Sequence, residues 1–510
     1  MSPAVAAPLD PRGHRRLERL LMALVIVAMG LRIAASDRRP VHADEAMNAT
    51  IVGHMLLGQP YRYDPHDHHG PTLYYISYAW MRLRGIRGIA DMDAVMLRIP
   101  AACAGAAAIF LLLLLRTELN TVEAAAAGLL IAGAAPMVYY GAYFIHETLV
   151  SSLALLIILA LGKYYDDEKH RRGWIFVAGA ALGALAATKE TFSLIAVAAF
   201  AAWAVIAGID WRRGLARTRP GVAAGLLLAA VVAISVALLF FTSAGHYPAG
   251  AKSMLAGIFR FVQRAKGEGH QKPWWTYLAW LTQTGRYRMA WTGVGIIALA
   301  AIGTVAALRR GAGALRFVGP FAFILAGFYT VIPYKTPWLM LDFLVPAAVV
   351  AGYGAGVLLR AAKATGRRAY FPTLLAVFIL AGFMARDTCR LAFLCPSDDR
   401  NPLAYSPTVP DADNIAPAVE AVAARVPDGR NLLVQVIGTN YWPLPWCLRR
   451  FPNVGYWSEP PATLRGTVVI ATMPLADAVT RKLGPGWSAQ YFGLRPGFLL
   501  LLYSPARNAP

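Results

Sequence analysis

Charged residues are scarce in this chain. They make up 15% of its 510 residues, whereas hydrophobic residues make up 57%. A soluble protein of this length needs far more polar surface. The hydrophobic residues also form blocks of the length that crosses a bilayer as a helix, about 20 residues. The scarcity of charge therefore excludes an ordinary soluble protein and predicts a polytopic membrane protein.

Cysteine is rare as well, with only Cys103, Cys389, Cys395 and Cys447. In the topology predicted below, Cys395 and Cys447 both face an oxidising compartment, so one disulfide is allowed, although their spacing does not establish it. A cleavable signal peptide is also lacking. The first apolar segment follows the basic residues 12–19, is too long and has no small-residue cleavage site, so it is predicted to be a signal anchor. Internal repeats and a nucleotide-binding glycine loop are absent.

Negative charge is outnumbered, because 49 basic residues face 28 acidic ones, a net charge of +21. The basic residues lie in short runs between apolar blocks, the pattern that orients a protein in anionic lipid. A nucleic-acid partner is therefore not expected.

Eleven apolar segments are long enough to be predicted as spans. They lie near residues 19–36, 95–115, 122–138, 148–163, 173–187, 191–209, 220–242, 290–308, 317–333, 338–359 and 371–388. Five basic loops fall on one side of this series, which makes that side and the N-terminus cytoplasmic. Loops 37–94 and 243–289 then face outward from the cytoplasmic (inner) membrane, together with the tail. Both loops carry basic residues too, but long loops are less bound by the charge rule.

The composition changes near residue 396. A polar, proline-rich linker leads to "NLLVQVIG", "TVVIAT" and "FLLLLYS", which are predicted to be strands. The predicted fold is an all-α polytopic bundle over residues 1–390 with a small extracytoplasmic α/β domain within residues 396–510. The aromatic-rich "NYWPLPWCLRR" in this domain is predicted to belong to its core and its contact with the bundle, although a recognition role is an alternative.

Asp44 and Glu45 follow the first span closely. Carboxylates near the hydrocarbon are costly unless they face protein or water, so they indicate a functional cavity. A partly buried carboxylate can act as a general base, and an adjacent pair can hold a divalent cation. The alternative is an acidic cap on a loop helix, since "HADEAMNATIVGHMLLG" looks helical.

The string "DPHDHHGP" at residues 64–71 includes His66 and His69. Histidine with carboxylate suits zinc or a related metal, but the spacing matches no zinc signature. A solvated turn, or a contact to the phosphate of a substrate, is an equal alternative. The string "YYGAYFIHE" places His146 and Glu147 at the start of the fourth span, where an acidic residue also suits the helix dipole.

Two further outward hairpins carry lysine. "ATKET" contains Lys189 and Glu190, and "IPYKTPW" contains Tyr334 and Lys335. Either lysine could bind phosphate as a point charge, but Lys189 could instead pair with Glu190, and Lys335 could snorkel. Acid, base and cation on one face of the membrane suit the transfer of a group from a lipid phosphate.

The strings "HADEA", "YDPHDHHGPTLYY", "YYGAYFIHE", "TKE" and "PYKTPWL" resemble those of GT-C-fold integral-membrane glycosyltransferases. This group includes protein O-mannosyltransferases, aminoarabinose transferases and oligosaccharyltransferase catalytic subunits. The similarity is greatest to a prokaryotic family named for association with flippase activity in archaeal glycosylation, and it covers roughly residues 15–390. The resemblance implies a polyprenyl-phosphate sugar donor and an essential first-loop aspartate, which maps onto Asp44. Family patterns often show an arginine where this chain has Ala142.

The expected activity is therefore hexosyl or pentosyl transfer from a polyprenyl-phosphate-linked sugar to an acceptor hydroxyl at the outer face of the bilayer. Asp44 is the expected base, with Glu45 beside it. The donor phosphate is expected near Lys189 and Lys335, and His69 and Tyr334 are the other residues assigned to the donor. The supporting acid–base residues are His146, Glu147 and Glu190.

A divalent metal is a further expectation, with Asp44, His66 and Glu147 as its candidate ligands; GT-C enzymes include metal-dependent and metal-independent members. The alternative function is a non-enzymatic transporter or flippase-associated protein for lipid-linked sugars. Such a protein is expected to show repeats or paired glycine and proline interruptions, which this sequence lacks. The sequence does not name the sugar, the acceptor or the prenyl chain.

Overall fold

The structure is a computed structural model that describes residues 11–215, 221–265, 271–310 and 312–506. The start of the predicted span 220–242, part of the loop 243–289 and the end of the tail lie outside the described residues. The chain divides into two compact units. The first contains residues 1–35, 61–76 and 98–394, and the second contains residues 36–60, 77–97 and 395–510.

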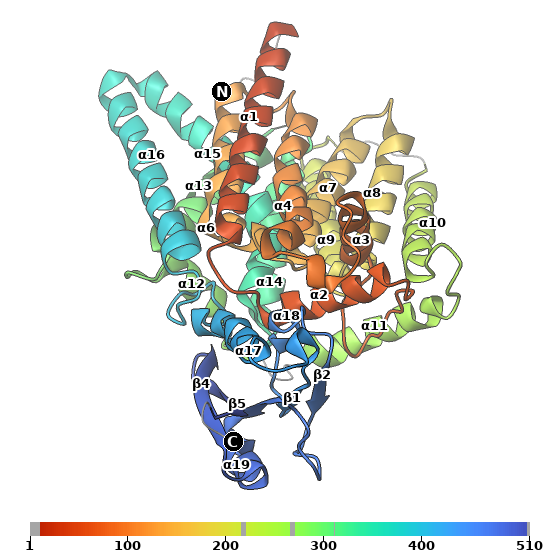
Figure 1. The fold of residues 1–510 in the computed structure, drawn as a ribbon. Coiled ribbons are helices and arrows are strands. Elements are labelled where there is room, and N and C mark those ends of the chain that lie inside the picture. Colours follow the sequence, from red (N-terminus) through yellow and green to blue (C-terminus); the bar gives the residue numbers. More distant parts are fainter. Residues whose placement is uncertain (1–10, 216–220, 266–270, 311, 507–510) are drawn as a thin grey trace. The chain divides into compact units, whose positions relative to one another are not determined.

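The first unit is built from helices, most of which run alongside one another (Figure 1). They are α1 (Pro11–Ser36), α4 (Ala94–Phe110), α5 (Thr121–Gly133), α6 (Ala135–Gly141), α7 (Glu147–Asp166), α8 (Arg171–Ala186), α9 (Phe192–Arg212), α10 (Val222–Phe241), α11 (Gly250–Ala265), α12 (Thr276–Thr282), α13 (Ala290–Leu308), α14 (Leu315–Val331), α15 (Leu341–Thr365) and α16 (Arg367–Thr388). Short 3₁₀ turns continue α4 and precede α15, and a π turn follows α16.

Each of the eleven predicted spans falls on helix. By length and composition, eight helices among the described residues can cross a membrane, and a ninth span results if α5 and α6 are counted as one broken helix. The helices α8 and α14 have 16 and 17 residues, which is shorter than the other candidates. The predicted polytopic helical bundle is thus confirmed, with eight or nine helices that meet the length for a span.

The core of the first unit centres on α15, of whose apolar stretch 89% is buried, compared with 11% for α10. Glycines let α13 approach it closely. An added Cβ would lie 1.9 Å from the Val350 carbonyl oxygen at Gly303, and 2.1 Å from the Leu299 carbonyl oxygen at Gly354. Small residues are the usual means of close helix packing in membranes, where lipid offers no hydrophobic drive for association.

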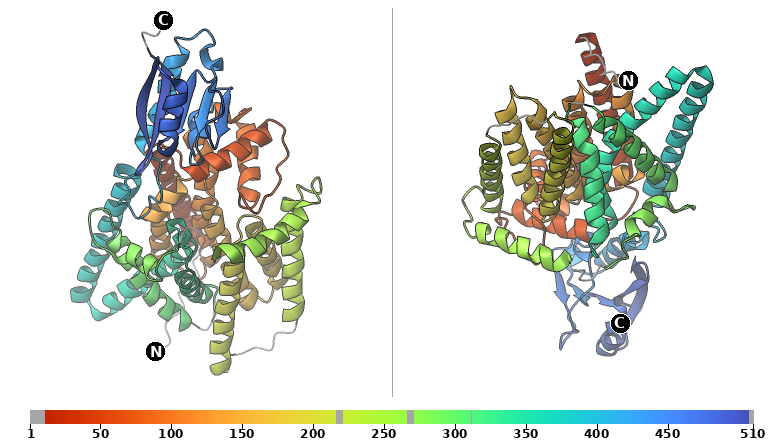
Figure 2. Two further views of the ribbon diagram at one scale, coloured as in Figure 1. Left: turned by 90° about the horizontal axis from the view of Figure 1, so that it is seen from below. Right: turned by 180° about the vertical axis from the view of Figure 1, so that it is seen from behind.

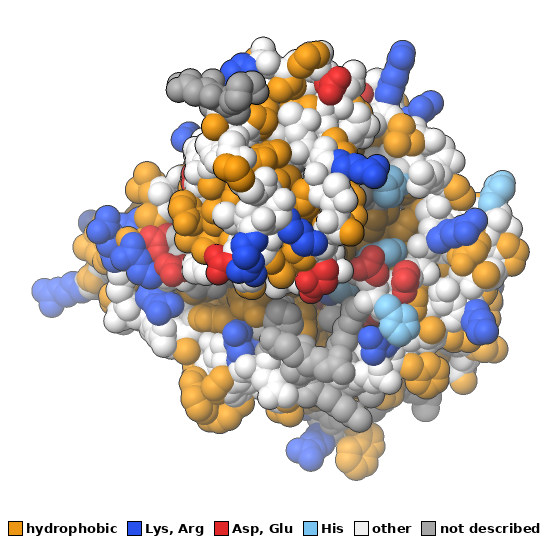
Figure 3. Space-filling model, turned by 60° about the horizontal axis from the view of Figure 1, so that its bottom comes forward, with side chains coloured by type: hydrophobic (Ala, Val, Ile, Leu, Met, Phe, Trp, Pro, Cys, Tyr) orange, Lys and Arg blue, Asp and Glu red, His pale blue; other side chains and the backbone are white. Residues whose placement is uncertain are grey.

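Large apolar side chains on the outer helices are exposed. Phe200 of α9 is 57% exposed, Leu227 of α10 66% and Phe378 of α16 66%. Hydrophobic side chains also reach the surface in many places on the face drawn in Figure 3. Exposed apolar surface of this extent is expected of helices that contact lipid rather than water.

The pair α5 and α6 is bent by 51° at Ala134. Bending frees the carbonyl groups at the end of α5, and buried carbonyls need donors. The fully buried Arg32 of α1 supplies them, because its guanidinium donates to the Ile131 oxygen at 3.0 Å and to the Ala132 oxygen at 3.3 Å. The arginine therefore holds the broken span together.

The second unit contains a five-stranded sheet whose strands lie side by side in Figure 2. Its elements are α2 (Ala43–Leu56), part of α3 (Thr72–Leu83), α17 (Ile415–Ala423), β1 (Val434–Ile437), α18 (Leu444–Cys447), β2 (Val454–Trp457), β3 (Val468–Thr472), α19 (Ala476–Leu483), β4 (Trp487–Arg495) and β5 (Phe498–Pro505). The strand order is β2-β1-β3-β5-β4, in which β1 is parallel to β2 and β3, and β5 is antiparallel to β3 and β4. The predicted α/β domain is thus confirmed, together with its three predicted strands.

Both faces of this sheet are covered. Val419 of α17 and Leu444 of α18 pack on one face with Val436, and Val479 of α19 packs on the other with Val469. Strands buried on both faces read as continuous apolar runs, which is why "NLLVQVIG" and "TVVIAT" were recognisable. The leucines of "NYWPLPWCLRR" belong to this core, as predicted. Cys395 and Cys447 are free thiols, so the disulfide that the sequence allowed is not formed.

Candidate functional site

Two of the polar strings are joined by backbone hydrogen bonds within the first unit. The Gly70 N–H donates to the Thr188 oxygen, and the Thr72 N–H donates to the Ala187 oxygen, each at 3.1 Å. The hydroxyls of Thr72 and Thr188 lie 2.7 Å apart. A Cβ on Gly70 would lie 2.3 Å from the Ala187 oxygen, so only glycine fits here. The "HHGP" loop is thereby fixed against the "TKE" hairpin.

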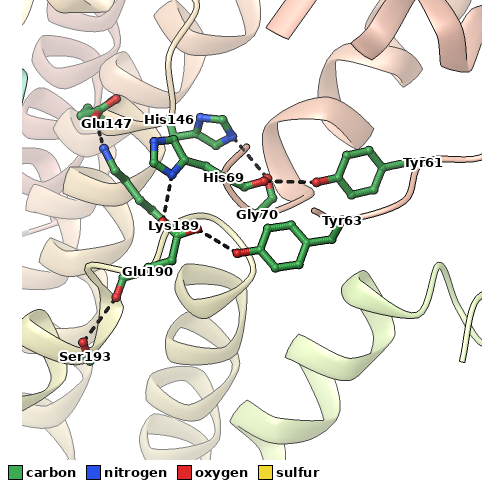
Figure 4. Close-up of polar contacts among 9 residues, drawn as sticks. All are labelled: Tyr61, Tyr63, His69, Gly70, His146, Glu147, Lys189, Glu190 and Ser193. Carbon is green, nitrogen blue, oxygen red and sulfur yellow. Dashed lines mark hydrogen bonds and ion pairs between the residues drawn. The ribbon is translucent and has the colours of Figure 1, made fainter. Parts of the chain in front are cut away.

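The Glu190 carboxylate interacts with two side chains, one in the "HHGP" loop and one in the segment before it (Figure 4). His69 Nδ1 lies 2.8 Å from Glu190 Oε2, and the Tyr63 hydroxyl donates to Oε1 at 2.9 Å. Burial of Glu190 opposes its ionisation, but His69 and the hydrogen bonds outweigh burial and lower the pKa of Glu190 to about 2. Glu190 is therefore ionised at neutral pH.

His146 lies against the same loop. Its Nε2 donates to the Gly70 carbonyl oxygen at 3.2 Å, since a carbonyl can only accept. Its ring makes edge contacts with His69 and Tyr74, each with centroids 5.3 Å apart. Burial lowers the pKa of His146 well below its usual value, and the charges of His69 and Lys189 lower it further. His146 is therefore a neutral donor.

Lys189 forms a buried ion pair with Glu147, the first residue of α7 (Figure 4). Burial by itself would lower the pKa of Lys189, but the charge and the hydrogen bond of Glu147 raise it more, so the net shift is upward. The ammonium is therefore charged. The sequence left open a pair between Lys189 and Glu190; the structure pairs Lys189 with Glu147 instead.

The lysine of the "IPYKTPW" hairpin is turned into the protein. The ammonium of Lys335 donates to the Ile332 oxygen and, at 2.9 Å, to the Thr330 oxygen, which are carbonyls at the C-terminal end of α14. The side chain is buried rather than snorkelling, and burial lowers the pKa of Lys335. Two of its three N–H groups are thus engaged, and its contact with a donor phosphate stays a prediction. Tyr334 is close enough to Lys189 to influence its charge.

Sequence reasoning missed Asp342, in the first turn of α15. This carboxylate is completely buried and accepts a hydrogen bond of 2.6 Å from the Tyr329 hydroxyl. Within the described residues, its Oδ1 atom has no hydrogen-bond partner. Its charge also helps to keep Lys189 protonated. A carboxylate inside the predicted span 338–359 was the available signal, since such residues mark functional sites by default.

Asp44 and Glu45 belong to the second unit, where they begin α2. His42 is the N-cap: its Nδ1 accepts from the Asp44 N–H at 3.1 Å, and Glu45 Oε2 accepts from the His42 N–H at 2.9 Å. This reciprocal arrangement is a capping box. Glu45 is fully buried in that role, whereas the Asp44 side chain is 51% exposed. Of the two carboxylates, Asp44 is thus the accessible one.

The C-terminal residues of the second unit hold this motif in place. His42 Nδ1 is an acceptor, so its Nε2 carries the proton and donates to the Tyr405 oxygen at 3.2 Å. The Thr408 hydroxyl donates to the Val41 oxygen at 2.9 Å. Arg495 of β4 is close enough to Asp44 for their charges to interact. The orientation of Asp44 therefore depends on residues more than 350 positions away.

The first unit thus gathers one cluster of predicted residues, made of His69, His146, Glu147, Lys189 and Glu190. The joining of Asp44 to this cluster stays a prediction. His66 is exposed on the turn whose backbone is capped by Asp64. Among the described residues, no group of three or more His, Cys, Asp or Glu side chains is arranged to hold a metal ion.

The chain is similar to known proteins both in sequence and in fold. Residues 68–239 match the family described as dolichyl-phosphate-mannose-protein mannosyltransferase. The fold is similar to ArnT from Cupriavidus metallidurans bound to undecaprenyl phosphate, with a TM-score of 0.66 and 14% identity over 97% of this chain and 99% of that one. It is also similar to the archaeal oligosaccharyltransferase AglB from Archaeoglobus fulgidus in complex with an inhibitory peptide and a dolichol-phosphate, with a TM-score of 0.56 and 12% identity over 98% of this chain and 75% of that one. No curated protein sequence matches the chain.

The family match covers the strings from "HHGP" to "TKE", which are those that the structure joins. The solved structures share the fold over almost the whole chain. The GT-C fold predicted from the sequence is thus confirmed, and the family match over residues 68–239 supports a glycosyltransferase.

Proposed function

We propose that the chain transfers a hexosyl or pentosyl group from a polyprenyl-phosphate donor to an acceptor hydroxyl, at the extracytoplasmic face of the cytoplasmic membrane. The mannosyltransferase match supports the reaction class. The donor class is supported by two structures of the same fold, one solved with undecaprenyl phosphate and the other with a dolichol-phosphate. The basic loops support a cytoplasmic N-terminus and an outward-facing site.

The observation that carries this proposal is the fixed cluster at the start of α7. Lys189 is charged, buried and held by Glu147, while His69 is held by Glu190. Three segments distant in sequence supply these groups, and none of the four is needed to close a helix. A buried, charged side chain that is not required to cap a helix favours a ligand of opposite charge. We assign the donor phosphate to Lys189 and His69, with Tyr334 and Lys335 at the neighbouring hairpin.

In the proposed reaction, the Asp44 carboxylate takes the proton of the acceptor hydroxyl. The acceptor oxygen then forms a bond to the anomeric carbon as the bond from that carbon to the phosphate oxygen breaks. The electron pair leaves with the polyprenyl phosphate, and Lys189 stabilises the negative charge that grows there. A single displacement inverts the anomeric centre, so product retaining the donor configuration would contradict this step.

Asp44→Asn tests the proposal against the matched control Asp67→Asn, which removes another exposed carboxylate of the same loop. Loss of a general base reduces turnover by about 10²–10⁴-fold, whereas binding of the polyprenyl-phosphate sugar should be retained. Each variant is produced in a strain lacking the gene, and glycolipids and surface glycans are profiled by mass spectrometry. Unchanged glycans with Asp44→Asn would favour a non-catalytic role in handling lipid-linked sugars.

The predicted divalent metal at Asp44, His66 or Glu147 is tested separately. Elemental analysis of the purified protein, before and after a chelator, measures the bound metal directly. Asp44→Asn should lower the metal content if that residue is a ligand, while Asp67→Asn should leave it unchanged.

A further inference from the structure

A second polar site lies in the first unit, on residues that the proposed reaction does not use. It is a pocket of about 450 Å³ between the segment leading into α13 and the end of α16. This volume falls within the range of small-molecule sites, about 300–1,000 Å³. Four of its eight lining residues are arginines, namely Arg286, Arg288, Arg386 and Arg390, and none is acidic.

The four guanidinium groups are poorly matched by protein partners. Within the described residues, none of them donates a hydrogen bond. The nearby carboxylate is Asp387, whose Oδ1 lies 3.8 Å from Arg386. Asp387 is already engaged at the start of α13, because its Oδ2 accepts from the Thr292 N–H at 3.3 Å and from the Thr292 hydroxyl at 2.9 Å. This carboxylate lies near Arg386 and Arg390, so the pocket as a whole carries more positive than negative charge.

Arginines elsewhere in this unit are treated differently. Arg316 is paired with Asp210, Arg360 with Glu123, and Arg310 donates to the Glu118 carbonyl oxygen at 2.9 Å. Each of these side chains completes a contact within the fold. Among the pocket arginines, Arg386 is the one with a carboxylate within 4 Å in the described residues, at 3.8 Å from Asp387. Pairing within the fold therefore does not explain why four of them gather there.

The position of the pocket identifies the kind of anion. Both α13 and α16 are candidate spans, and the pocket lies where one begins and the other ends. Trp291, which also lines the pocket, is 48% exposed and stacks on Phe383 with centroids 5.0 Å apart. Tryptophan is enriched at the level of lipid headgroups. The N-terminus of the 19-residue α13 adds a positive dipole end at the same place.

We propose that this pocket binds the phosphate group of an anionic lipid headgroup. A guanidinium fork matches the oxygens of a phosphate in planar, bidentate geometry. Basic pockets between membrane helices on the cytoplasmic side take lipid headgroups in this way, and the same chemistry applies to an anionic lipid on either side. Free phosphate shares this chemistry, and the experiment separates the two sources. The proposal is independent of sugar transfer, because it uses none of the residues assigned to that reaction.

The test uses the full-length protein in neutral detergent and counts bound lipid by native mass spectrometry. Short-chain phosphatidylglycerol, phosphatidylcholine and inorganic phosphate are titrated separately, and inorganic phosphate is also added as a competitor. The variant Arg288→Gln/Arg390→Gln should raise the Kd for phosphatidylglycerol at least tenfold. Arg288→Lys/Arg390→Lys should give an intermediate value, since lysine keeps the charge but loses the fork.

The matched control is Arg367→Gln/Arg368→Gln, which removes two exposed arginines from the other end of α16. It should change the Kd less than twofold. All variants should keep the thermal unfolding midpoint, because the pocket arginines make no hydrogen bonds within the described residues. Tenfold weaker binding in the pocket variant alone supports the proposal, and competition by inorganic phosphate supports recognition of the phosphate group itself.

Three results would overturn the proposal. Equal binding of phosphatidylglycerol by the wild type and the glutamine variant would show that lipid binds elsewhere. Phosphatidylcholine bound as tightly as phosphatidylglycerol would show that net charge is not recognised. Binding of inorganic phosphate without binding of phosphatidylglycerol would assign the pocket to a free anion instead of a lipid.

Discussion

Both ends of α7 carry an ion pair with a buried carboxylate, but the two pairs are built from different groups. The helix has 20 residues, which at 1.5 Å per residue is about 30 Å, the thickness of the hydrocarbon layer. At its start, Glu147 pairs with Lys189 beside His146 and His69. Near its end, Lys163 Nζ lies 3.2 Å from Glu118 Oε1. Similar charges therefore lie at opposite ends of one helix.

The end near Lys163 is explained by the fold itself. The Glu118 carboxylate also accepts from the backbone N–H groups of Ala314 and Leu315, at 3.1 and 2.8 Å, so it caps the start of α14. The charged residues at the start of α7 cap no helix in this way within the described residues. Their charges meet histidine, tyrosine and each other, groups that exchange protons or bind anions. The comparison teaches that a buried charge indicates a functional site only when it is not needed to satisfy backbone groups of the fold.

The largest expected effect on this comparison comes from breaking the contact between the "HHGP" loop and the "TKE" hairpin near the start of α7. Gly70→Ala places a Cβ against the Ala187 carbonyl oxygen and should separate the "HHGP" loop from the "TKE" hairpin. We expect at least a tenfold loss of sugar transfer. Gly173→Ala is the control, because an added Cβ there meets nothing within 4 Å. Equal activity of the two variants in the glycan profile would show that the pairing of these loops does not matter for transfer.

The second prediction compares the two lysines. Lys189→Met leaves Glu147 buried and unpaired, which costs about 3–5 kcal/mol. Lys163→Met should cost less, because Glu118 keeps its two backbone donors. Thermal unfolding in detergent measures both. The double variant Glu147→Gln/Lys189→Met should recover stability but not transfer, and recovery of both would contradict a role for Lys189 with the donor.

The smallest expected effect is a pH dependence of the stability, and it arises from His146 at the start of α7. The pKa of His146 is lowered in the folded protein, so below its usual value of about 6.5 the unfolded chain binds a proton that the folded chain does not. Stability should therefore fall as the pH is lowered from 7 to 5. His146→Gln should flatten this slope in unfolding experiments. Glu190 titrates lower and is not involved there, because its pKa is about 2.

The sequence predicts the helices better than the edges of the sheet. Every predicted span falls on helix within the described residues, and β1, β3 and β5 were visible as buried runs. The strand β2 was missed because all four of its residues are only partly buried, and β4 because its exposed edge residues do not alternate and a bulge interrupts it near Gly493. Edge strands of this kind lack the hydrophobic period on which prediction depends.

The sequence predicts which residues belong to the candidate site better than it predicts which of them contact one another. The motifs indicated that His69, Glu147 and Lys189 share one side of the membrane, but not that Lys189 would choose Glu147 over its neighbour Glu190. The partners in a tight hairpin depend on neighbouring segments, and here Glu190 is already bonded to His69 and Tyr63. Asp342 was overlooked because a single acid does not interrupt a strongly apolar segment.

The bend between α5 and α6 has a consequence for how a substrate would be selected. Arg32 closes the bend, and every residue from 134 to 150 is buried, so the segment that delivers His146 and Glu147 is packed on all sides. A wall of this kind cannot wrap around a ligand as a surface loop does. Under the proposed function, discrimination at this wall comes from its fixed shape and not from the closing of a loop over the substrate.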